Sequence, residues 1–255
     1  MTLLKSILIS FSIYSKIPVP QFPWEEKDMK YILCFFPWIG IIIGLLVYGW
    51  SYLCFRYQIG TLCYALIATS IPLMVSGGFH TDGFMDTMDA FHSYQPKERK
   101  LEILKDSHIG AFSVIMFALY YLIYVGAVSE VQSLRYCAIY CCSFLIARTL
   151  SGIGVVTFRS AKQDGLLYTF ASGAHKTIVK VTLYLQLIAG IAFMLWIAWV
   201  PAFMALAAGF LTFVYYRVKS FRELGGITGD TAGYFVTICE LAFVLAAAVC
   251  QIFEF

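Results

Sequence analysis

Three carboxylates stand close together in the polar stretch between residues 76 and 110, SGGFHTDGFMDTMDAFHSYQPKERKLEILKDSHIG. Asp82, Asp86 and Asp89 follow the spacing i, i+4, i+7, so on an α-helix, at about 100° per residue, they point within an arc of roughly 60°. Like charges at this spacing repel one another, and a divalent cation such as Mg²⁺ is the simplest compensation. The pattern predicts a Mg²⁺ site on one helix face, with a solvated acidic helix end as the alternative.

A glycine-rich turn, GGITGD from Gly225 to Asp230, opens the last apolar segment. Such turns present backbone N–H groups to anions when they lead into a helix. The turn is a weak signal by itself. Glu240, ten residues further along, strengthens it, because a carboxylate inside an apolar segment indicates a functional site. Gly77 and Gly78 similarly allow the backbone beside the acidic motif to approach a ligand closely.

Three further residues are candidates for the site because of their positions in the sequence. His80 lies two residues before Asp82 and is a possible base. Asp106 and Ser107 lie a few residues before an apolar segment, where helix capping and catalysis both explain them. An acidic metal cluster, a glycine-rich anion loop and basic residues nearby suit transfer of a phosphoryl-type group, where positioning and charge neutralisation do most of the catalysis.

The composition requires a membrane around these residues. The chain has 255 residues, of which 60% are hydrophobic and 13% are charged, and its mean hydropathy is +0.78. A soluble domain carries about twice that charged fraction. The net charge of +3 is small and gives no indication of nucleic-acid binding, whereas membrane lipid is an expected partner. The eight cysteines include no C-x-x-C pair and read as small apolar side chains.

The apolar segments predict an all-α, polytopic membrane domain comprising residues 1–255, with about seven spans and an N-terminal interfacial helix. A cleaved signal peptide is disfavoured, because no small-residue cleavage site follows the first apolar run. Gly40 and Gly44 predict close helix packing, Pro201 marks a turn, and Arg148 inside a span requires an anionic partner from the protein or a ligand. The expected spans are residues 31–54, 61–75, 111–128, 136–158, 178–200, 202–216 and 232–253.

The basic residues predict the orientation. Seven spans place the polar segments 1–30, 77–109, 159–177 and 217–230 on one side of the membrane. The positive-inside rule puts that side in the cytoplasm, with the N-terminus inside. Fifteen of the eighteen basic residues lie in or next to these segments: Lys5, Lys16, Lys27, Lys30, Lys97, Arg99, Lys100, Lys105, Arg159, Lys162, Lys176, Lys180, Arg217, Lys219 and Arg222.

At these motifs the sequence resembles the cobalamin synthase family, also called adenosylcobinamide-GDP ribazoletransferases. The resemblance is carried by GGFHTDGFMDTMDA, then LEILKDSHIG, then GGITGDTAG with Glu240 downstream. It extends to ISFSIYSKIPVP near the N-terminus, FPWIGIIIG in the first span and IARTL around Arg148. Three positions depart from the family pattern: Ala90 replaces a glycine, His108 an arginine, and Thr237 a first glutamate.

The resemblance implies a Mg²⁺-dependent enzyme of the bacterial or archaeal cytoplasmic membrane. It would join the activated lower arm of adenosylcobinamide-GDP to a ribose hydroxyl of α-ribazole or its 5′-phosphate and release GMP. A homo-oligomer, or a complex with other enzymes of cobalamin biosynthesis, is compatible with it. The implied catalytic residues are Asp82, Asp86 and His80. The implied metal ligands are Asp82, Asp86, Asp89, Asp106, Asp230 and Glu240. The implied substrate contacts are Gly77, Gly78, Lys105, Ser107, Arg148, Gly225, Gly226, Thr228 and Gly229.

Two other functions are alternatives. A CDP-alcohol phosphotransferase-like lipid synthase also uses aspartates at a membrane boundary, but its run places two aspartates three apart before a glycine and an Ala-Arg pair. Here Gly83 follows Asp82 directly and no Ala-Arg follows. A transporter more often carries polar groups through the midplane and shows half-repeat symmetry. The concentration of polar residues on one side favours an enzyme.

Overall fold

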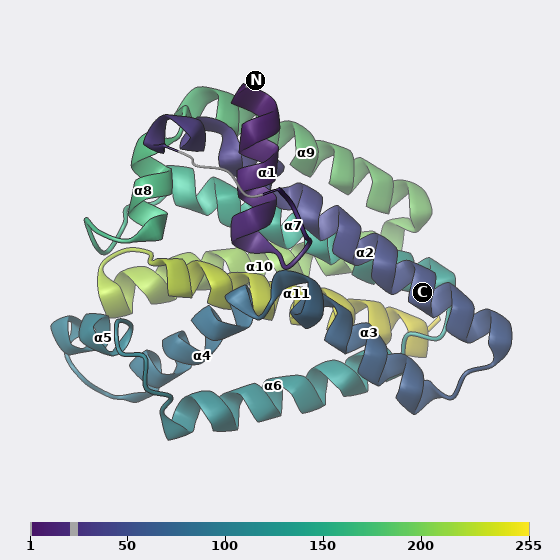
Figure 1. Ribbon diagram of the computed structural model, residues 1–255. Coiled ribbons are helices and arrows are strands. Elements are labelled where there is room, and N and C mark those ends of the chain that lie inside the picture. Colours follow the sequence, from purple (N-terminus) through teal and green to yellow (C-terminus); the bar gives the residue numbers. More distant parts are fainter. Residues whose placement is uncertain (1, 21–24, 255) are drawn as a thin grey trace.

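The computed structural model describes residues 2–20 and 25–254, and the regular structure in this part of the chain is helical (Figure 1). Apart from a single bridge between Ser160 and Ile227, no β-structure occurs among these residues. The predicted all-α class is confirmed. The helices are α1 (Thr2–Tyr14), the 3₁₀ helix η1 (Glu26–Tyr31), α2 (Ile32–Tyr57), α3 (Thr61–Ser76), α4 (Phe79–His92), α5 (Lys97–Ile103), α6 (Ala111–Ser129), α7 (Leu134–Thr157), α8 (Leu166–Gly173), α9 (Lys176–Ile197), α10 (Trp199–Leu224) and α11 (Gly229–Ile252).

Six of the described helices are long and apolar enough to cross a membrane: α2, α6, α7, α9, α10 and α11. The remaining expected span, residues 61–75, corresponds to α3, which passes the same test only together with α4, and the two helices meet at 94°. Gly77 and Gly78 form this bend with φ values of +64° and +81°, a region that glycine enters without steric cost. Figure 1 shows α6 running back beneath both arms of the bend.

The core forms around α7, whose side chains are buried along most of its length. Its most extensive partner is α2, and α11 packs against α4, α7 and α10. A Cβ atom at Gly44 would lie 2.7 Å from the backbone oxygen of Cys141, and one at Gly40 would overlap the backbone of Phe144. The predicted role of these glycines in close helix packing is confirmed. All eight cysteines are free, as expected.

The helix expected for the acidic motif is confirmed as α4, and the segment 77–109 also contains α5. Two expected polar loops are partly helical instead, because the segment 159–177 contains α8 and α10 continues to Leu224. Glu223 stabilises the end of α10 by pairing with buried Lys100 of α5 and with Lys219. The turn predicted at Pro201 lies instead at Ala198, where the backbone is extended. Pro201 belongs to the first turn of α10, which tolerates proline.

Two polar connections far apart in sequence join at one end of the bundle. Ala161 donates its backbone N–H to Ile227, and Ile227 donates to Arg159. Gly226 permits this approach, because a Cβ atom there would lie 2.7 Å from the backbone nitrogen of Ala161. In Figure 1 the connections that carry α5 and α8 and the α10–α11 turn lie at the same end of the bundle, with α1 crossing the direction of the long helices.

Candidate active site

Two glycines bring α4 and α11 into contact. A Cβ atom at Gly83 would lie 2.8 Å from the backbone oxygen of Asp230, and one at Gly233 would lie 3.0 Å from that of His80. Larger residues at either position would therefore push the two helices apart. This close approach places the acidic motif of α4 beside the first turn of α11.

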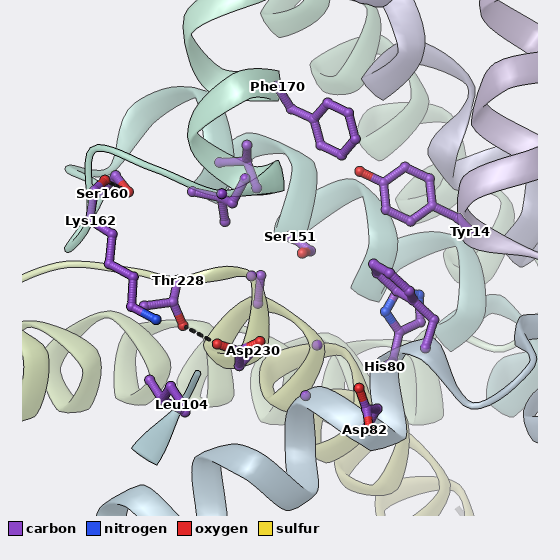
Figure 2. Close-up of a pocket in the computed structure, with 18 of the residues that line it drawn as sticks. Tyr14, His80, Asp82, Leu104, Ser151, Ser160, Lys162, Phe170, Thr228 and Asp230 are labelled. Atoms are coloured by element: carbon purple, nitrogen blue, oxygen red, sulfur yellow. Dashed lines mark hydrogen bonds between the residues drawn. The ribbon is translucent and has the colours of Figure 1, made fainter. Parts of the chain in front are cut away.

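A cavity of about 350 Å³, the central cavity, opens beside this helix contact (Figure 2). Elements along the whole chain contribute to it, from the end of α1 to the beginning of α11. Its polar lining residues include Asp82, Lys105, Ser160, Lys162, Thr228 and Asp230, and its aromatic wall includes Tyr14, Phe36, Phe79 and Phe170. The cavity combines a charged side with an apolar side, as small-molecule sites commonly do.

Three carboxylates lie at or near the charged side. Asp82 and Asp230 line the central cavity, and half-buried Asp86, one turn beyond Asp82 on α4, lies within electrostatic reach of both. Among the described residues, no hydrogen bond or ion pair of the protein reaches the side chain of Asp82 or Asp86. Asp230 accepts a 3.3 Å hydrogen bond from Thr228. Their mutual repulsion favours binding of a cation.

Two lysines offer positive charge to the same cavity. Lys162 points toward Thr228 and Asp230 in Figure 2, and the bridge between the two polar connections holds it there. Partial burial lowers the pKa of Lys162, and nearby Asp230 opposes that shift. Lys105 forms a 2.9 Å ion pair with Asp164 in which both side chains are exposed. An anionic ligand can therefore draw Lys105 inward at small cost.

His80 lies in the apolar wall with one ring nitrogen lacking a partner. The ring lies against Tyr14, Phe36 and Phe79, at centroid separations of 5.4–6.5 Å. Its Nε2 atom is buried and has no hydrogen-bond partner among the described residues. A neutral imidazole is the stable form among apolar rings, and its free nitrogen can accept a proton.

Asp89 serves a different purpose, although it belongs to the same motif. Its two carboxylate oxygens accept the backbone N–H groups of Gly110 and Ser113, at 2.7 and 2.9 Å. These N–H groups lie at the start of α6, where the helix itself supplies no acceptor, so Asp89 of α4 caps α6. Gly110 is the N-cap residue. The capping role considered for Asp106 and Ser107 is therefore wrong, because α6 begins later and takes its cap from α4.

Asp106 and Ser107 lie apart from the acidic cluster. Asp106 accepts hydrogen bonds from the backbone N–H of His108, at 3.0 Å, and from its ring at 2.6 Å. The bonds to His108 lower the pKa of Asp106. Ser107 is exposed, and neither residue lines the central cavity.

Arg148 and Glu240 form a buried ion pair deep in the bundle, with Nη1 of Arg148 and Oε1 of Glu240 separated by 2.7 Å. Both side chains are less than 10% exposed, and Arg148 also donates to the backbone oxygen of Phe144. The prediction that Arg148 requires an anionic partner is confirmed, and the protein supplies that partner. The pair lines a small cavity of about 20 Å³ that also touches His80.

The glycine-rich turn divides between structural and site positions. Gly225 ends α10 with φ of +74°, and Gly226 makes room for the backbone of residues 159–161. Thr228 is the N-cap of α11 and accepts the backbone N–H of Thr231. Thr228 and Gly229 line the central cavity. The part of this turn that can contact a ligand in the central cavity is therefore its second half, from Thr228 to Asp230.

Sequence reasoning did not identify Tyr14, Ser160, Lys162 or Phe170 as site residues. Each comes from a segment that looked peripheral and reaches the cavity only through tertiary packing. Lys162 carried a partial signal, because it belongs to a basic segment on the predicted cytoplasmic side.

The carboxylates fit Mg²⁺ of the kind that is shared with a substrate. Among the described residues, no three His, Cys, Asp or Glu side chains converge closely enough to hold a metal by themselves. Magnesium commonly binds through one or two carboxylates together with substrate phosphates and water. The unpartnered oxygens of Asp82 and Asp86, with Asp230 opposite, suit that arrangement. Carboxylates that could share a metal with a ligand, together with lysines at the same cavity, have the chemistry that suits a diphosphate.

Comparison with known proteins agrees along nearly the whole chain. A family model described as cobalamin-5-phosphate synthase matches residues 6–248. The adenosylcobinamide-GDP ribazoletransferase of Lachnoclostridium phytofermentans is 43% identical over 252 residues, which cover 97% of this chain and 95% of that protein. The protein of the same name from Clostridium perfringens strain SM101 is 32% identical and covers 94% of this chain and 96% of its own length. No solved structure matches.

Proposed function

This chain belongs to the cobalamin-5-phosphate synthase family, and on that premise we propose that it is an adenosylcobinamide-GDP ribazoletransferase. The donor is adenosylcobinamide-GDP, and the acceptor is α-ribazole or its 5′-phosphate. The observation that supports this most strongly is that Asp82, Asp230 and Lys162 line one cavity, with Asp86 beside it. That cavity has the charges needed for a diphosphate donor.

The reaction is a displacement at phosphorus. A ribose hydroxyl of the acceptor attacks the phosphorus that carries the cobinamide arm and forms a new P–O bond. The bond between this phosphorus and the bridging oxygen breaks, and its electron pair leaves with GMP. A carboxylate of the acidic cluster, or His80, takes the hydroxyl proton. The products are adenosylcobalamin, or its 5′-phosphate, and GMP.

Asp82, Asp86 and Asp230 would hold Mg²⁺ against the diphosphate. Bound there, the metal supplies charge neutralisation for the diphosphate and for the departing GMP. Lys162 and Lys105, which line the same cavity, donate to phosphate oxygens. Asp89, Asp106 and Glu240 have protein partners and take no direct part in this scheme.

The enzyme would work at the cytoplasmic face of the bacterial or archaeal cell membrane. The connections that form the central cavity carry most of the basic residues, and the positive-inside rule places them in the cytoplasm. The described helices of the opposite end expose Trp196 and Trp199, residues that suit the other membrane interface. Water-soluble substrates reach such a site from the cytoplasm.

The test is GMP release by purified protein in detergent, supplied with adenosylcobinamide-GDP and α-ribazole, with and without Mg²⁺. The proposal expects turnover that requires Mg²⁺ and is lost on chelation. Lipid synthesis from a CDP-activated donor by the same preparation, without GMP release, would replace it with the lipid-synthase alternative. Substrate flux in proteoliposomes without chemical change would replace it with a transporter.

A further inference from the structure

A second cavity lies on the other side of the α4 aspartate. This bend cavity has a volume of about 490 Å³ and is formed by the end of α1, the α3–α4 bend and Phe117 of α6. Phe79 and Asp82 line both the bend cavity and the central cavity. The two cavities therefore meet at the residue that is proposed to hold the metal.

The end of α1 and the start of α4 separate the two cavities. Ile13 lines the bend cavity, whereas its neighbour Tyr14 lines the central cavity. The ring of Tyr14 contacts Phe79 with a centroid separation of 5.4 Å. The backbone N–H of Lys16 donates to Val75 at 2.7 Å and ties α1 to the bend. The wall is thus built from packed side chains and a backbone hydrogen bond, with Asp82 at its edge.

The two cavities differ in charge. The central cavity carries Lys105 and Lys162 together with Asp82, Asp164 and Asp230. The bend cavity has a single cation, Lys16, and a single carboxylate, Asp82, among its described lining residues. The rest of its wall consists of glycines, hydroxyl groups and apolar side chains, including Met85 and Phe117. Such a surface suits an uncharged ribose and an aromatic base rather than a diphosphate.

In a displacement at phosphorus, the attacking and leaving oxygens stand roughly in line on opposite sides of the phosphorus atom. We propose that the bend cavity binds the acceptor nucleoside, that the central cavity binds the nucleotide diphosphate of the donor, and that the transferred phosphorus lies at Asp82 between them. This assignment rests on the proposed function. It gives each substrate its own entrance, and GMP leaves without passing the acceptor.

Lys16 offers the bend cavity a positive charge that could distinguish a phosphorylated acceptor from an unphosphorylated one. The aliphatic part of the lysine side chain packs against Gly77. A Cβ atom at residue 77 would lie 2.5 Å from Cγ of Lys16, so only glycine leaves room for this lysine. Among the described residues, no carboxylate pairs with this lysine. We infer that Lys16 binds the 5′-phosphate of a phosphorylated acceptor and so favours α-ribazole 5′-phosphate over α-ribazole.

The first test separates the two Michaelis constants. Ile13→Trp fills the bend cavity from an element outside the acidic motif, and Ile13→Val is its matched control. The assignment expects the KM for the acceptor to rise at least tenfold in Ile13→Trp, with the KM for the donor unchanged, and both constants unchanged in Ile13→Val. A rise in the donor KM without a rise in the acceptor KM, or unchanged constants in a folded Ile13→Trp, overturns it.

The second test addresses Lys16. Lys16→Met removes the charge and keeps the length, and Lys16→Arg restores the charge. The KM for α-ribazole 5′-phosphate should rise about tenfold or more in Lys16→Met, as expected for loss of a hydrogen bond to a charged group, and recover in Lys16→Arg. The KM for α-ribazole should not change. Equal losses for both acceptors would remove Lys16 from phosphate recognition.

A binding measurement keeps this inference distinct from the proposed function. α-Ribazole 5′-phosphate is titrated into wild-type, Ile13→Trp and Lys16→Met proteins without donor. The assignment expects weaker binding in both variants. If the wild type binds the acceptor in this way but releases no GMP, the proposed reaction fails and the acceptor site stands. If GMP release is normal and both variants bind like the wild type, the acceptor site fails and the reaction stands.

Discussion

The acidic side chains of this protein fall into two groups that differ in their partners. Asp82 and Asp86 have no hydrogen bond or ion pair from the described protein, and Asp230 accepts one long hydrogen bond. Asp89 instead receives two backbone N–H groups, and Glu240 receives a guanidinium. Two of these residues, Asp86 and Asp89, are only three positions apart on one helix. Carboxylates that the protein leaves unsatisfied are the ones available to a metal and a substrate, whereas the satisfied ones hold helices in place.

Removing the cation of the buried pair should have the largest effect. Arg148→Met leaves the carboxylate of Glu240 buried without a partner, which costs about 3–5 kcal/mol in comparable pairs. The variant should show strongly reduced thermal stability in detergent or fail to accumulate. The double variant Arg148→Met/Glu240→Gln should recover much of the loss. A stable but inactive single variant would mean that Arg148 acts on substrate rather than on the fold.

Asp82→Asn should lower turnover sharply and leave the fold intact. Losing one group that organises charge at the reacting centre typically lowers kcat by about 10²- to 10³-fold. Because no protein partner is lost, the unfolding temperature should stay near that of the wild type. The check is GMP release together with a melting curve of the same sample. A large drop in stability would place Asp82 with the structural carboxylates.

Lys162→Met should weaken the donor side of the reaction by a smaller factor. Loss of one hydrogen bond to a charged group corresponds to about a tenfold or larger rise in the donor KM. The acceptor KM should not change, since Lys162 lines only the central cavity of the two. Lys219→Met is a matched control, because Lys219 pairs with Glu223 and lines neither cavity. Similar losses in both variants would indicate a general effect of surface charge.

Asp89→Ala should mainly affect stability. Loss of a helix cap costs about 0.5–2 kcal/mol, so melting should move down modestly. Turnover at a temperature well below melting should stay within a few-fold of the wild type. GMP release and a melting curve, both measured on the Asp89→Ala protein, test this prediction. Loss of activity as deep as that of Asp82→Asn, without loss of stability, would return Asp89 to the metal site.

The sequence predicted the features that depend on local spacing. The apolar runs gave the spanning helices, the i, i+4, i+7 spacing placed three aspartates on one helix, and the charge of Arg148 required an anion inside the bundle. It did not predict which aspartate caps α6, because the donors lie about twenty residues away across a loop. Nor did it bring Lys162 to Asp230. That contact depends on the bridge between residues 160 and 227 and on the space that Gly226 leaves.

The most direct test compares two carboxylates of the same helix in their effect on the Mg²⁺ requirement. GMP release is measured against Mg²⁺ concentration for the wild type, Asp86→Asn and Asp89→Asn, each checked for folding by its melting curve. We predict that Asp86→Asn needs at least tenfold more Mg²⁺ for half-maximal rate, whereas Asp89→Asn keeps the wild-type requirement with a lower melting temperature. An unchanged requirement in Asp86→Asn together with a raised one in Asp89→Asn would contradict the division between available and satisfied carboxylates.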